Sequence, residues 1–453
     1  MNSIIVVGGS DAGISAALRA RELAPQAVVS MVVADQFPNY SICGLPFYLS
    51  GEVEHWQRLA HRSREEIEAA GIRLHLDTRV VAIDPVRHQV MVEQTDHGRA
   101  TWSYDRLVIA TGAKPIRPPI AGIDLPGVFD LHTMQGGLAL AQYLDARSVR
   151  SAVIIGAGYI GLEMADALIR RGIVGVTVLE QKNAVLPTVD EEFGRRLGAY
   201  LGQQGVRAES GVQVTEIERH GDGLRVLGRP SFSIDAELVL VVVGVEPNTE
   251  LGIRAGVAQG VRGALRVDRE MATNLPDVYA AGDCAETYHR LGQDPVYLPL
   301  GTTAHKQGRI AGANVTGAHE RYAGSLGTQV VKLFERAVAR TGWRDEEAKT
   351  AGRTPLTVQS THWDHKGYYP GAHPLHVRVT GDVADGRLLG AQILGHWQSS
   401  VAKRIDIFAA ALFQGLKVAD LLDIDLSYTP PFGSPWDPVQ LAAEAWEKAS
   451  RAD

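Results

Sequence analysis

The residues best suited to chemistry lie at positions 41–46, a stretch that contains Cys43. A helix beginning near Gly44 would place the Cys43 sulfur at its N-terminus, where unpaired N–H groups favour a thiolate over a thiol. A thiolate is a nucleophile and a redox group. An isolated cysteine is more often a small buried residue, but the segments described below favour the reactive interpretation. We therefore predict that Cys43 carries the reactive atom.

The N-terminal segment has the pattern of a dinucleotide-binding unit. Residues 4–7 form a β-branched run, which a glycine turn and an amphipathic stretch follow. Strand, glycine turn and helix form the context in which such a turn cradles a phosphate. Gly8 permits the tight turn, and Gly13 lets the helix and the strand pack closely. A second strand, residues 28–33, leads to Asp35, a carboxylate placed to accept hydrogen bonds from an adenosine ribose.

Two further features belong to this first unit. Asp11 lies in the glycine turn, where a carboxylate would repel a pyrophosphate unless it pointed away. We expect Asp11 to cap the helix N-terminus. An apolar strand at residues 107–109 then ends in Ala110, Thr111 and Gly112. These small residues let the chain approach a bound dinucleotide closely.

The same construction recurs in residues 152–180, and here it is complete. The second turn carries Gly156, Gly158 and Gly161, and the following strand ends at Glu180. Two such turns, each with its own acidic residue, predict two dinucleotides in one chain. The Glu180 carboxylate favours a free ribose 2′-hydroxyl, hence NADH over NADPH, although NADPH is possible.

Later turns complete the predicted cofactor sites. Gly244 stands where the chain leaves the second nucleotide unit. Gly282 and Asp283 end an apolar strand with a carboxylate suited to a hydroxylated ligand chain. Thr303 lies in a small-residue segment before a helix that we expect over residues 305–314.

The C-terminal part of the chain, from about residue 322, has a different pattern. Strand-like segments precede a helical run, which predicts an α+β domain. Two loops of this region contain Tyr369 and Tyr428, each near prolines, and the charged tail after Glu444 reads as a solvated helix end. The strand-like segments are residues 329–333, 356–361, 375–379 and 388–395, and the helix is expected over residues 401–413.

Composition limits the classes of protein. The chain has 453 residues, enough for about two to four domains. Its net charge of −7 gives no reason to expect nucleic acid. Two cysteines fit a reducing compartment, and Cys284 is expected to be a packed small residue. The longest apolar run, residues 238–245, is too short for a membrane span. The N-terminus enters a strand at once, so we expect no signal peptide and a cytoplasmic protein.

These motifs together resemble the flavoprotein disulfide reductases that bind two dinucleotides. The likeness covers essentially the whole chain and narrows to the branch with a single redox cysteine. That branch contains the coenzyme A-disulfide reductases, the NADH oxidases and the NADH peroxidases, and the sequence most resembles the first of these. The motifs that carry the resemblance are residues 41–46, 110–112, 156–161 and 282–283, together with Tyr428 and the prolines at 430 and 431.

The resemblance implies an α/β fold with two Rossmann-like dinucleotide-binding domains, for FAD and NAD(P)H, and a C-terminal α+β dimerisation domain. The FAD domain would comprise residues 1–115 and 245–320, and the NAD(P)H domain residues 116–244. Residues 321–453 would form a homodimer and lend residues to the active site of the partner subunit.

The resemblance also implies roles for single residues. Asp35 would hold the FAD ribose, Asp283 the ribityl chain of the flavin, and Glu180 the adenosine ribose of the nicotinamide cofactor. Tyrosines resembling Tyr369 and Tyr428 are associated in this group with activating or protonating the departing thiol.

The chain departs from several relatives. The position five residues after the reactive cysteine holds Tyr48, where glutathione-reductase-like enzymes have a second cysteine, so an intramolecular redox disulfide is excluded. His373 with its following proline does not reproduce their C-terminal acid–base motif. NADH peroxidases have a histidine in place of Asp11, and coenzyme A-disulfide reductases often have an asparagine in place of Ile42.

The resulting prediction is an FAD-dependent pyridine nucleotide-disulfide oxidoreductase. It would use NADH or NADPH to reduce a low-molecular-weight disulfide or persulfide, such as a coenzyme A disulfide, through Cys43. Two alternatives stay open: an NADH oxidase that reduces oxygen through a cysteine sulfenic acid, and a redox-sensing flavoprotein or electron-transfer partner with slow turnover. No metal site is predicted.

Overall fold

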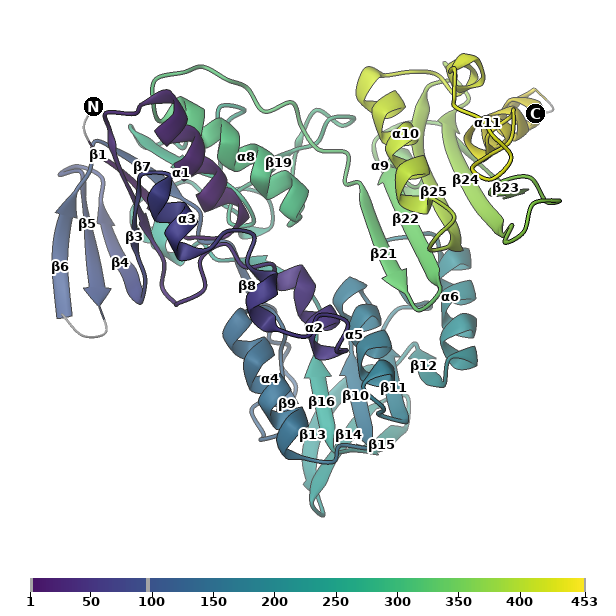
Figure 1. Cartoon of the computed structure of the whole chain (residues 1–453), viewed down its shortest axis with the longest axis horizontal. Helices are drawn as coiled ribbons and strands as arrows, with labels where there is room; N and C mark the ends of the chain where they lie inside the picture. The colour runs from purple at the N-terminus through teal and green to yellow at the C-terminus, as the bar shows by residue number, and fades with distance from the viewer. Residues whose placement is uncertain (1–2, 95–97, 452–453) are drawn as a thin grey trace.

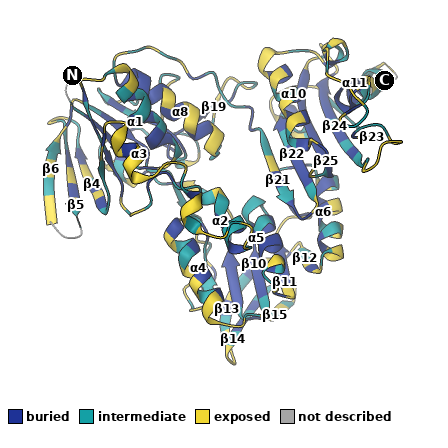
Figure 2. Cartoon of the chain, viewed as in Figure 1, coloured by how far each residue is buried: buried dark blue, intermediate teal, exposed yellow. Residues whose placement is uncertain are grey.

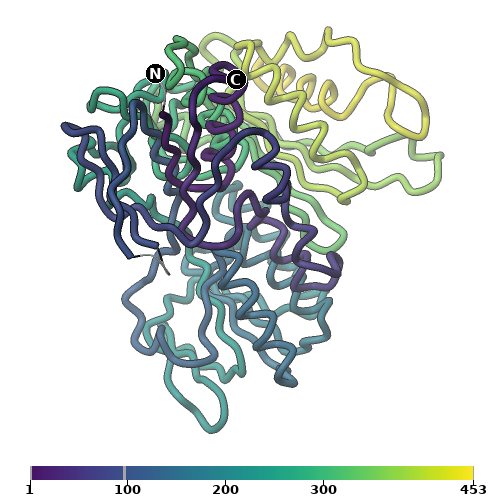
Figure 3. Tube along the Cα trace, turned by 60° about the vertical axis from the view of Figure 1, so that its left-hand side comes forward, coloured from purple at the N-terminus to yellow at the C-terminus, as the bar shows by residue number. Residues whose placement is uncertain are grey.

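The computed structural model describes residues 3–94 and 98–451. Two parallel sheets and one antiparallel sheet form three bodies, each with its own helices (Figures 1 and 3). The central strands of the three large sheets are buried, whereas the edge strand Gly98–Ser103 and the outer faces of the helices are exposed (Figure 2). The predicted fold class, two Rossmann-like units followed by a third unit, is therefore confirmed.

The first sheet is entirely parallel, with the strand order β18-β7-β1-β2-β3. Because both of its faces are covered, β1 is a continuous apolar run rather than an alternating one. Ile4 and Val6 face α1 and α8, whereas Ile5 and Val7 face the small antiparallel sheet β4-β5-β6. The strands are β1 (Ser3–Val7), β2 (Val28–Val32), β3 (Ile72–His75), β4 (Thr78–Asp84), β5 (Gln89–Gln94), β6 (Gly98–Ser103), β7 (Arg106–Ile109) and β18 (Val278–Ala280).

Helices α1 (Asp11–Leu23) and α8 (Gly301–Asn314) lie side by side on the first sheet (Figure 1). A side chain at Gly308 of α8 would meet the backbone oxygen of Ala12 at 2.2 Å, so glycine is required for this close approach. Helix α8 begins at Gly301 rather than at residue 305, a correction to the sequence prediction. The short helices of this unit are α3 (Arg64–Ala69) and α7 (Glu250–Arg254).

The second sheet repeats this construction, with the order β12-β11-β10-β16-β9. Ile154 of β10 faces the helices, and Val153 faces the antiparallel sheet β13-β14-β15. The strands are β9 (Val128–Phe129), β10 (Ser151–Ile155), β11 (Gly175–Glu180), β12 (Val206–Ser210), β13 (Gln213–His220), β14 (Gly223–Arg229), β15 (Phe232–Ala236) and β16 (Leu238–Val241). The helices are α4 (Met134–Ala146), α5 (Tyr159–Arg170) and α6 (Glu191–Gln203).

Two short ribbons complete the nucleotide-binding units. Strand β8 pairs with β17 where the chain passes from the first unit to the second and back, and β19 pairs with β20 before α8. Their bounds are β8 (Ala113–Pro115), β17 (Val245–Pro247), β19 (Thr287–Tyr288) and β20 (Pro295–Val296). No helix in the described residues is long and apolar enough to span a membrane.

The third sheet is antiparallel, with the order β21-β22-β25-β24-β23. Strand β22 was not predicted. The helix at the C-terminus buries Trp446, whose side chain is only 2% exposed, so the prediction of a solvated helix end is wrong for this residue. The elements are β21 (Gln329–Leu333), β22 (Arg336–Gly342), β23 (Pro355–Trp363), β24 (Pro374–Asp382), β25 (Leu388–His396), α9 (Asp345–Thr350), α10 (Val401–Gln414) and α11 (Pro438–Ser450).

Candidate functional site

Cys43 lies in a 3₁₀ turn (Ile42–Gly44) that leads directly into helix α2 (Leu45–Leu49). Helix α2 belongs to the first unit in sequence but packs on α4 and α5 of the second. Its first residue, Leu45, is fully buried. A side chain at Gly137 of α4 would lie 2.5 Å from a methyl carbon of Leu45, so the two helices touch closely. The Cys43 turn is thereby placed between the two units that are built on the parallel sheets.

Cys43 is exposed and its thiol is free. Cys284 is buried, which confirms the prediction that it is a packed small residue. The predicted thiolate, however, is not supported. Although the Cys43 sulfur reaches solvent, protein atoms packed around it desolvate it, and this raises the pKa of the thiol. The carboxylates of Glu163, Asp11 and Asp283 raise the pKa further. Helix α2 has only five residues, so the positive end of its dipole is too weak to reverse these effects.

The first glycine turn brings together several predicted residues. Gly8 has a φ of 112°, and a side chain there would meet the Ala110 carbonyl oxygen at 2.1 Å. A side chain at Gly13 would meet the Gly8 carbonyl oxygen at 2.0 Å. One oxygen of the Asp35 carboxylate accepts a hydrogen bond from the Phe37 N–H at 2.9 Å. The carboxylate therefore retains lone pairs for a ribose.

The end of β18 faces the same turn, because a side chain at Gly282 would lie 2.7 Å from the Ala12 side chain. Burial, together with the Asp11 charge, raises the pKa of Asp283 to about 6. Within the described residues, the side-chain nitrogen (Nδ2) of Asn39 and the hydroxyl of Tyr297 are buried without a hydrogen-bond partner. Such orphaned groups are normally satisfied by a ligand or a water. This donor and acceptor set fits a flavin dinucleotide with its hydroxylated ribityl chain.

Four other predicted cofactor residues have defined surroundings. The Thr111 hydroxyl donates a hydrogen bond to the Asn248 carbonyl oxygen at 2.6 Å, so it fastens the turn rather than facing a ligand. A side chain at Gly112 would meet nothing within 4 Å. Thr303 is buried in the first turn of α8, and Gly244 adopts a φ of 115° beside β17.

The second glycine turn is more open. A side chain at Gly161 would meet the Gly156 carbonyl oxygen at 1.9 Å, whereas one at Gly158 would meet nothing within 4 Å. Open space beside a helix N-terminus fits a pyrophosphate. Glu180 is only 6% exposed, and its two oxygens accept hydrogen bonds from the backbone N–H groups of Ala157 at 3.0 Å and Lys182 at 2.9 Å.

Asp11 does not cap α1, which corrects the sequence prediction. The N-cap position is Ser10, and no side chain there accepts a capping hydrogen bond. Asp11 is instead the first helical residue, and its carboxylate lies 3.4 Å from Nε2 of His305 on α8. The Nδ1 of His305 lies 2.8 Å from the Ser15 hydroxyl. Asp11 therefore ties α1 to α8.

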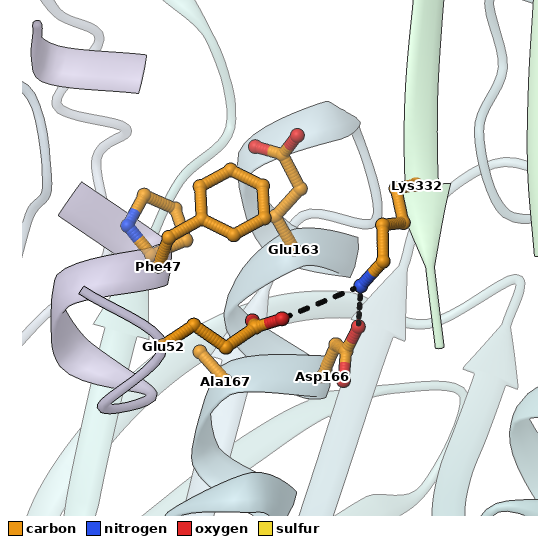
Figure 4. Close-up of a pocket in the computed structure, with 7 residues that line it drawn as sticks. Phe47, Glu52, Glu163, Asp166, Ala167 and Lys332 are labelled. Atoms are coloured by element: carbon orange, nitrogen blue, oxygen red, sulfur yellow. Dashed lines mark ion pairs between the residues drawn. The ribbon is translucent and has the colours of Figure 1, made fainter. Parts of the chain in front are cut away.

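Four charged residues gather beneath α2 around a cavity of about 10 Å³, lined also by Phe47 (Figure 4). Lys332 of β21 lies 3.7 Å from Glu52 and 3.9 Å from Asp166. In Figure 4 the Glu163 carboxylate stands apart from these ion-paired groups. Burial and the Asp166 charge raise the pKa of Glu163 to about 7, although Lys332 opposes this.

The two predicted tyrosines lie on neighbouring loops of the third unit. The Lys366 N–H donates to the Pro430 carbonyl oxygen at 3.4 Å, and the Lys366 ammonium lies 6.0 Å from the Tyr428 ring centre. Tyr369 and Tyr428 are 43% and 44% exposed. Within the described part of this single chain, their loops lie away from α2 (Figure 1).

A buried ion pair fixes these loops. Arg404 donates to the Asp437 carboxylate at 2.9 Å and to the backbone oxygens of Ser399 and Asp364 at 2.7 Å. The two half-exposed tyrosines thus lie on loops that this ion pair connects.

Residues 2–308 match the family model described as pyridine nucleotide-disulphide oxidoreductase, and residues 328–438 match the dimerisation domain of that family. The chain belongs to this family. An NAD(P)H sulfur oxidoreductase (CoA-dependent) from Pyrococcus abyssi is 33% identical over 453 residues, which cover 97% of each chain.

Solved structures of family members superimpose closely. An NAD-dependent persulfide reductase from A. fulgidus matches with a TM-score of 0.95 at 33% identity, over 99% of this chain and 84% of that one. A water-forming NADH oxidase from Lactobacillus brevis matches with a TM-score of 0.94 at 28% identity, over 100% and 99%. The resemblance to the branch of coenzyme A-disulfide reductases and NADH oxidases is confirmed.

Sequence reasoning missed several residues of this site. Asn39, Tyr297 and His305 carry no local motif, and Lys332 lies in an ordinary strand. Only the folded chain brings them to the glycine turns and to α2, so no signal in the sequence alone could have found them.

Proposed function

We propose that the protein is an FAD-dependent NAD(P)H oxidoreductase that reduces a low-molecular-weight disulfide or persulfide through Cys43. The observation that carries this proposal is an exposed, free thiol between two nucleotide-binding turns, with the other cysteine buried. The coenzyme A-dependent sulfur oxidoreductase and the persulfide reductase among the relatives support a sulfur substrate, including a coenzyme A disulfide.

The geometry of the two turns supports a site for each cofactor. The first turn, with Asp35, Asp283, Asn39 and Tyr297, would hold FAD, which supplies electron-pair transfer between the nicotinamide and sulfur. The second turn, with Gly158 and Glu180, would hold NADH, or NADPH. We assign residues 1–115 and 245–320 to the FAD domain, residues 116–244 to the NAD(P)H domain and residues 321–453 to the dimerisation domain.

The chain's own residues perform the sulfur chemistry. The Cys43 thiolate attacks one sulfur of R–S–S–R; one S–S bond breaks, a thiolate leaves, and a Cys43–S–S–R bond forms. Tyr428 with Tyr369, from the partner subunit of a homodimer, would protonate the departing thiolate. The exposed position of both hydroxyl-bearing loops supports this assignment.

The test is anaerobic NADH oxidation by the purified holoenzyme with coenzyme A disulfide, coenzyme A persulfide and other small disulfides. Cys43→Ser should abolish disulfide reduction while hydride transfer from NADH to the flavin survives. Cys284→Ser, at the buried cysteine, is the matched control. Normal disulfide turnover by Cys43→Ser would exclude the proposed mechanism.

A second candidate function is an NADH oxidase in which Cys43 cycles through a sulfenic acid. The superposition on the Lactobacillus brevis NADH oxidase supports it. An oxygen electrode distinguishes the two, because an oxidase consumes oxygen with NADH when no disulfide is present.

A further inference from the structure

His365 lies in the loop between β23 and β24, and the function proposed above assigns it no role. Its side chain is only 12% exposed, and its Nδ1 lies 2.9 Å from a carboxylate oxygen of Asp364. The centre of its ring lies 5.8 Å from that of the Tyr369 ring, with the two ring planes at 73°. This is the edge-to-face geometry that aromatic rings in contact prefer. His365 therefore joins a buried carboxylate to one of the two tyrosines assigned to proton transfer.

Asp364 is a fixed point of the third unit. The Ser399 hydroxyl donates a hydrogen bond to one oxygen of the Asp364 carboxylate at 2.5 Å, and the backbone N–H of His373 donates to the other at 3.0 Å. The backbone N–H of Asp364 donates in turn to the His373 carbonyl oxygen at 3.0 Å. Asp364 and His373 thus close the base of the loop 365–372, which carries Tyr369.

The Tyr369 side chain has few other contacts that could hold it. It is 43% exposed. Within the described residues its hydroxyl forms no hydrogen bond, and its one aromatic neighbour is His365. The backbone N–H of Tyr369 donates to the Lys366 carbonyl oxygen at 2.8 Å. This bond fixes the turn but leaves the side-chain torsions of the tyrosine free, so the His365 ring sets the direction of the phenol.

The His365 ring is itself held on one side. Its Nε2 is buried and, in the part of the chain that the structure describes, has no hydrogen-bond partner. The Asp364 carboxylate is therefore the polar group that orients the ring. Loss of this contact should release the His365 ring, and with it the ring of Tyr369.

We propose that His365 is a positioning residue. Held by Asp364, its ring fixes the Tyr369 ring in the orientation from which the hydroxyl protonates the departing thiolate in the active site of the partner subunit. In that step the O–H bond of Tyr369 breaks, an S–H bond forms on the thiol, and water returns a proton to the phenolate. His365 itself gains and loses no proton. The inference rests on the proposed function, in that Tyr369 is a proton donor.

The test compares variants of the purified holoenzyme in anaerobic turnover of NADH with coenzyme A disulfide. His365→Leu should lower kcat about tenfold, because a misplaced donor loses its near-attack geometry. The KM for NADH and the stopped-flow rate of flavin reduction by NADH should stay within about twofold of wild type, since neither step uses Tyr369. If His365→Leu does not fold, His365→Asn also lacks the ring and should show the same loss.

Rescue by a conservative variant separates orientation from general damage. Asp364→Asn keeps an oxygen that can face Nδ1 of His365 and should retain most of the wild-type kcat, whereas Asp364→Ala should match His365→Leu. His362→Leu, at a half-buried histidine of β23, is the matched control and should leave kcat unchanged. Equal losses in Asp364→Asn and Asp364→Ala would overturn the inference.

A double-mutant cycle tests whether His365 acts through Tyr369. His365→Leu combined with Tyr369→Phe should be no slower than Tyr369→Phe alone, because the ring has nothing left to position. Losses that multiply in the double variant would overturn the inference, and so would a His365→Leu variant that slows flavin reduction as much as turnover.

A measurement without substrate separates this inference from the proposed function. In protein labelled with 3-fluorotyrosine, the Tyr369 fluorine signal is assigned by its loss in Tyr369→Phe. The signal should shift in His365→Leu and in Asp364→Ala, and stay in place in Asp364→Asn. An unchanged signal in all three would overturn the inference. The expected shifts in an enzyme that reduces no disulfide would refute the proposed function while supporting the placement of Tyr369 by His365.

Discussion

The two glycine turns, residues 8–13 and 156–161, start from the same strand–turn–helix construction and differ in what surrounds them. The first is covered by α8, whose glycines pack closely against α1. In the described part of the chain it also contains donors without hydrogen-bond partners and the buried carboxyl group of Asp283. The second is open at Gly158, and its acidic residue, Glu180, is already bonded to backbone N–H groups. An enclosed site whose polar groups lack hydrogen-bond partners suits a cofactor that stays bound. An open site whose acidic residue is already hydrogen-bonded to the backbone suits one that enters and leaves in each turnover.

The largest expected effect comes from the last glycine of each turn. In Gly13→Ala and in Gly161→Ala the new side chain would lie within 2.0 Å of a backbone oxygen. Each variant should lose about 3 kcal/mol or more of stability, because backbone has to move. We expect Gly13→Ala to be isolated without flavin, whereas Gly161→Ala retains flavin and loses reduction by NADH. Absorbance at 450 nm and stopped-flow reduction measure the two properties. If both variants lost flavin, the proposed difference in cofactor between the two turns would be wrong.

The acidic residue of the second turn is predicted to be structural as well as ligand-binding. Glu180→Gln places an amide N–H₂ group opposite backbone N–H donors, which should destabilise the protein by about 2 kcal/mol. The melting temperature without nucleotide measures this effect, and the ratio of kcat/KM for NADH and NADPH measures the second role. An unchanged melting temperature would show that the two backbone hydrogen bonds contribute nothing.

Replacement of Asp283, at the end of β18, should stabilise the protein, whereas replacement of Glu180 should destabilise it. Burial raises the folded-state pKa of Asp283 to about 6, above the ordinary range of an aspartate carboxyl group. The group therefore destabilises the flavin-free fold as pH rises from about 4 to about 6. Asp283→Asn should stabilise the apoprotein at pH 7.5 by about 1–2 kcal/mol and have little effect at pH 4. Chemical denaturation at both pH values is the measurement, and equal effects at the two would exclude burial of the charge as the cause.

The smallest structural effect is expected at Gly158, where a side chain finds open space. Gly158→Ala should leave the melting temperature and flavin content unchanged, since its φ of −77° suits alanine. The added methyl group occupies the approach of the pyrophosphate, so the KM for NADH should rise by about tenfold, equivalent to about 1.4 kcal/mol. Steady-state kinetics with varied NADH checks this. An unchanged KM would place the pyrophosphate elsewhere.

The sequence was sufficient for features determined locally. Both turns could be located from the glycine spacing, the β-branched strands and the acidic strand ends. Each motif is a short segment whose residue types are set by local steric requirements. It also predicted the buried Cys284, whose thiol donates to backbone oxygens of Ile109 and Ala281.

Features that depend on distant segments were missed. The direction of the Cys43 pKa shift was missed because its largest cause, desolvation of the thiol, arises only when the chain packs around it, and the carboxylates of Glu163 and Asp283 come close only after folding. Asp11 was assigned a cap because its partner, His305, lies on another helix. Strand β22 and the burial of Trp446 likewise depend on packing within the third sheet.

The order of strands in the first sheet bears on which of the two units can fold first during synthesis. Strand β18, at residues 278–280, completes that sheet beside β7, whereas all strands of the second sheet lie between residues 128 and 241. When the ribosome has passed residue 241, the second unit therefore has all strands of its sheet, while the first unit still lacks its edge strand β18. Since domains fold as units during synthesis, the unit that carries the second glycine turn can close before the unit that carries the first.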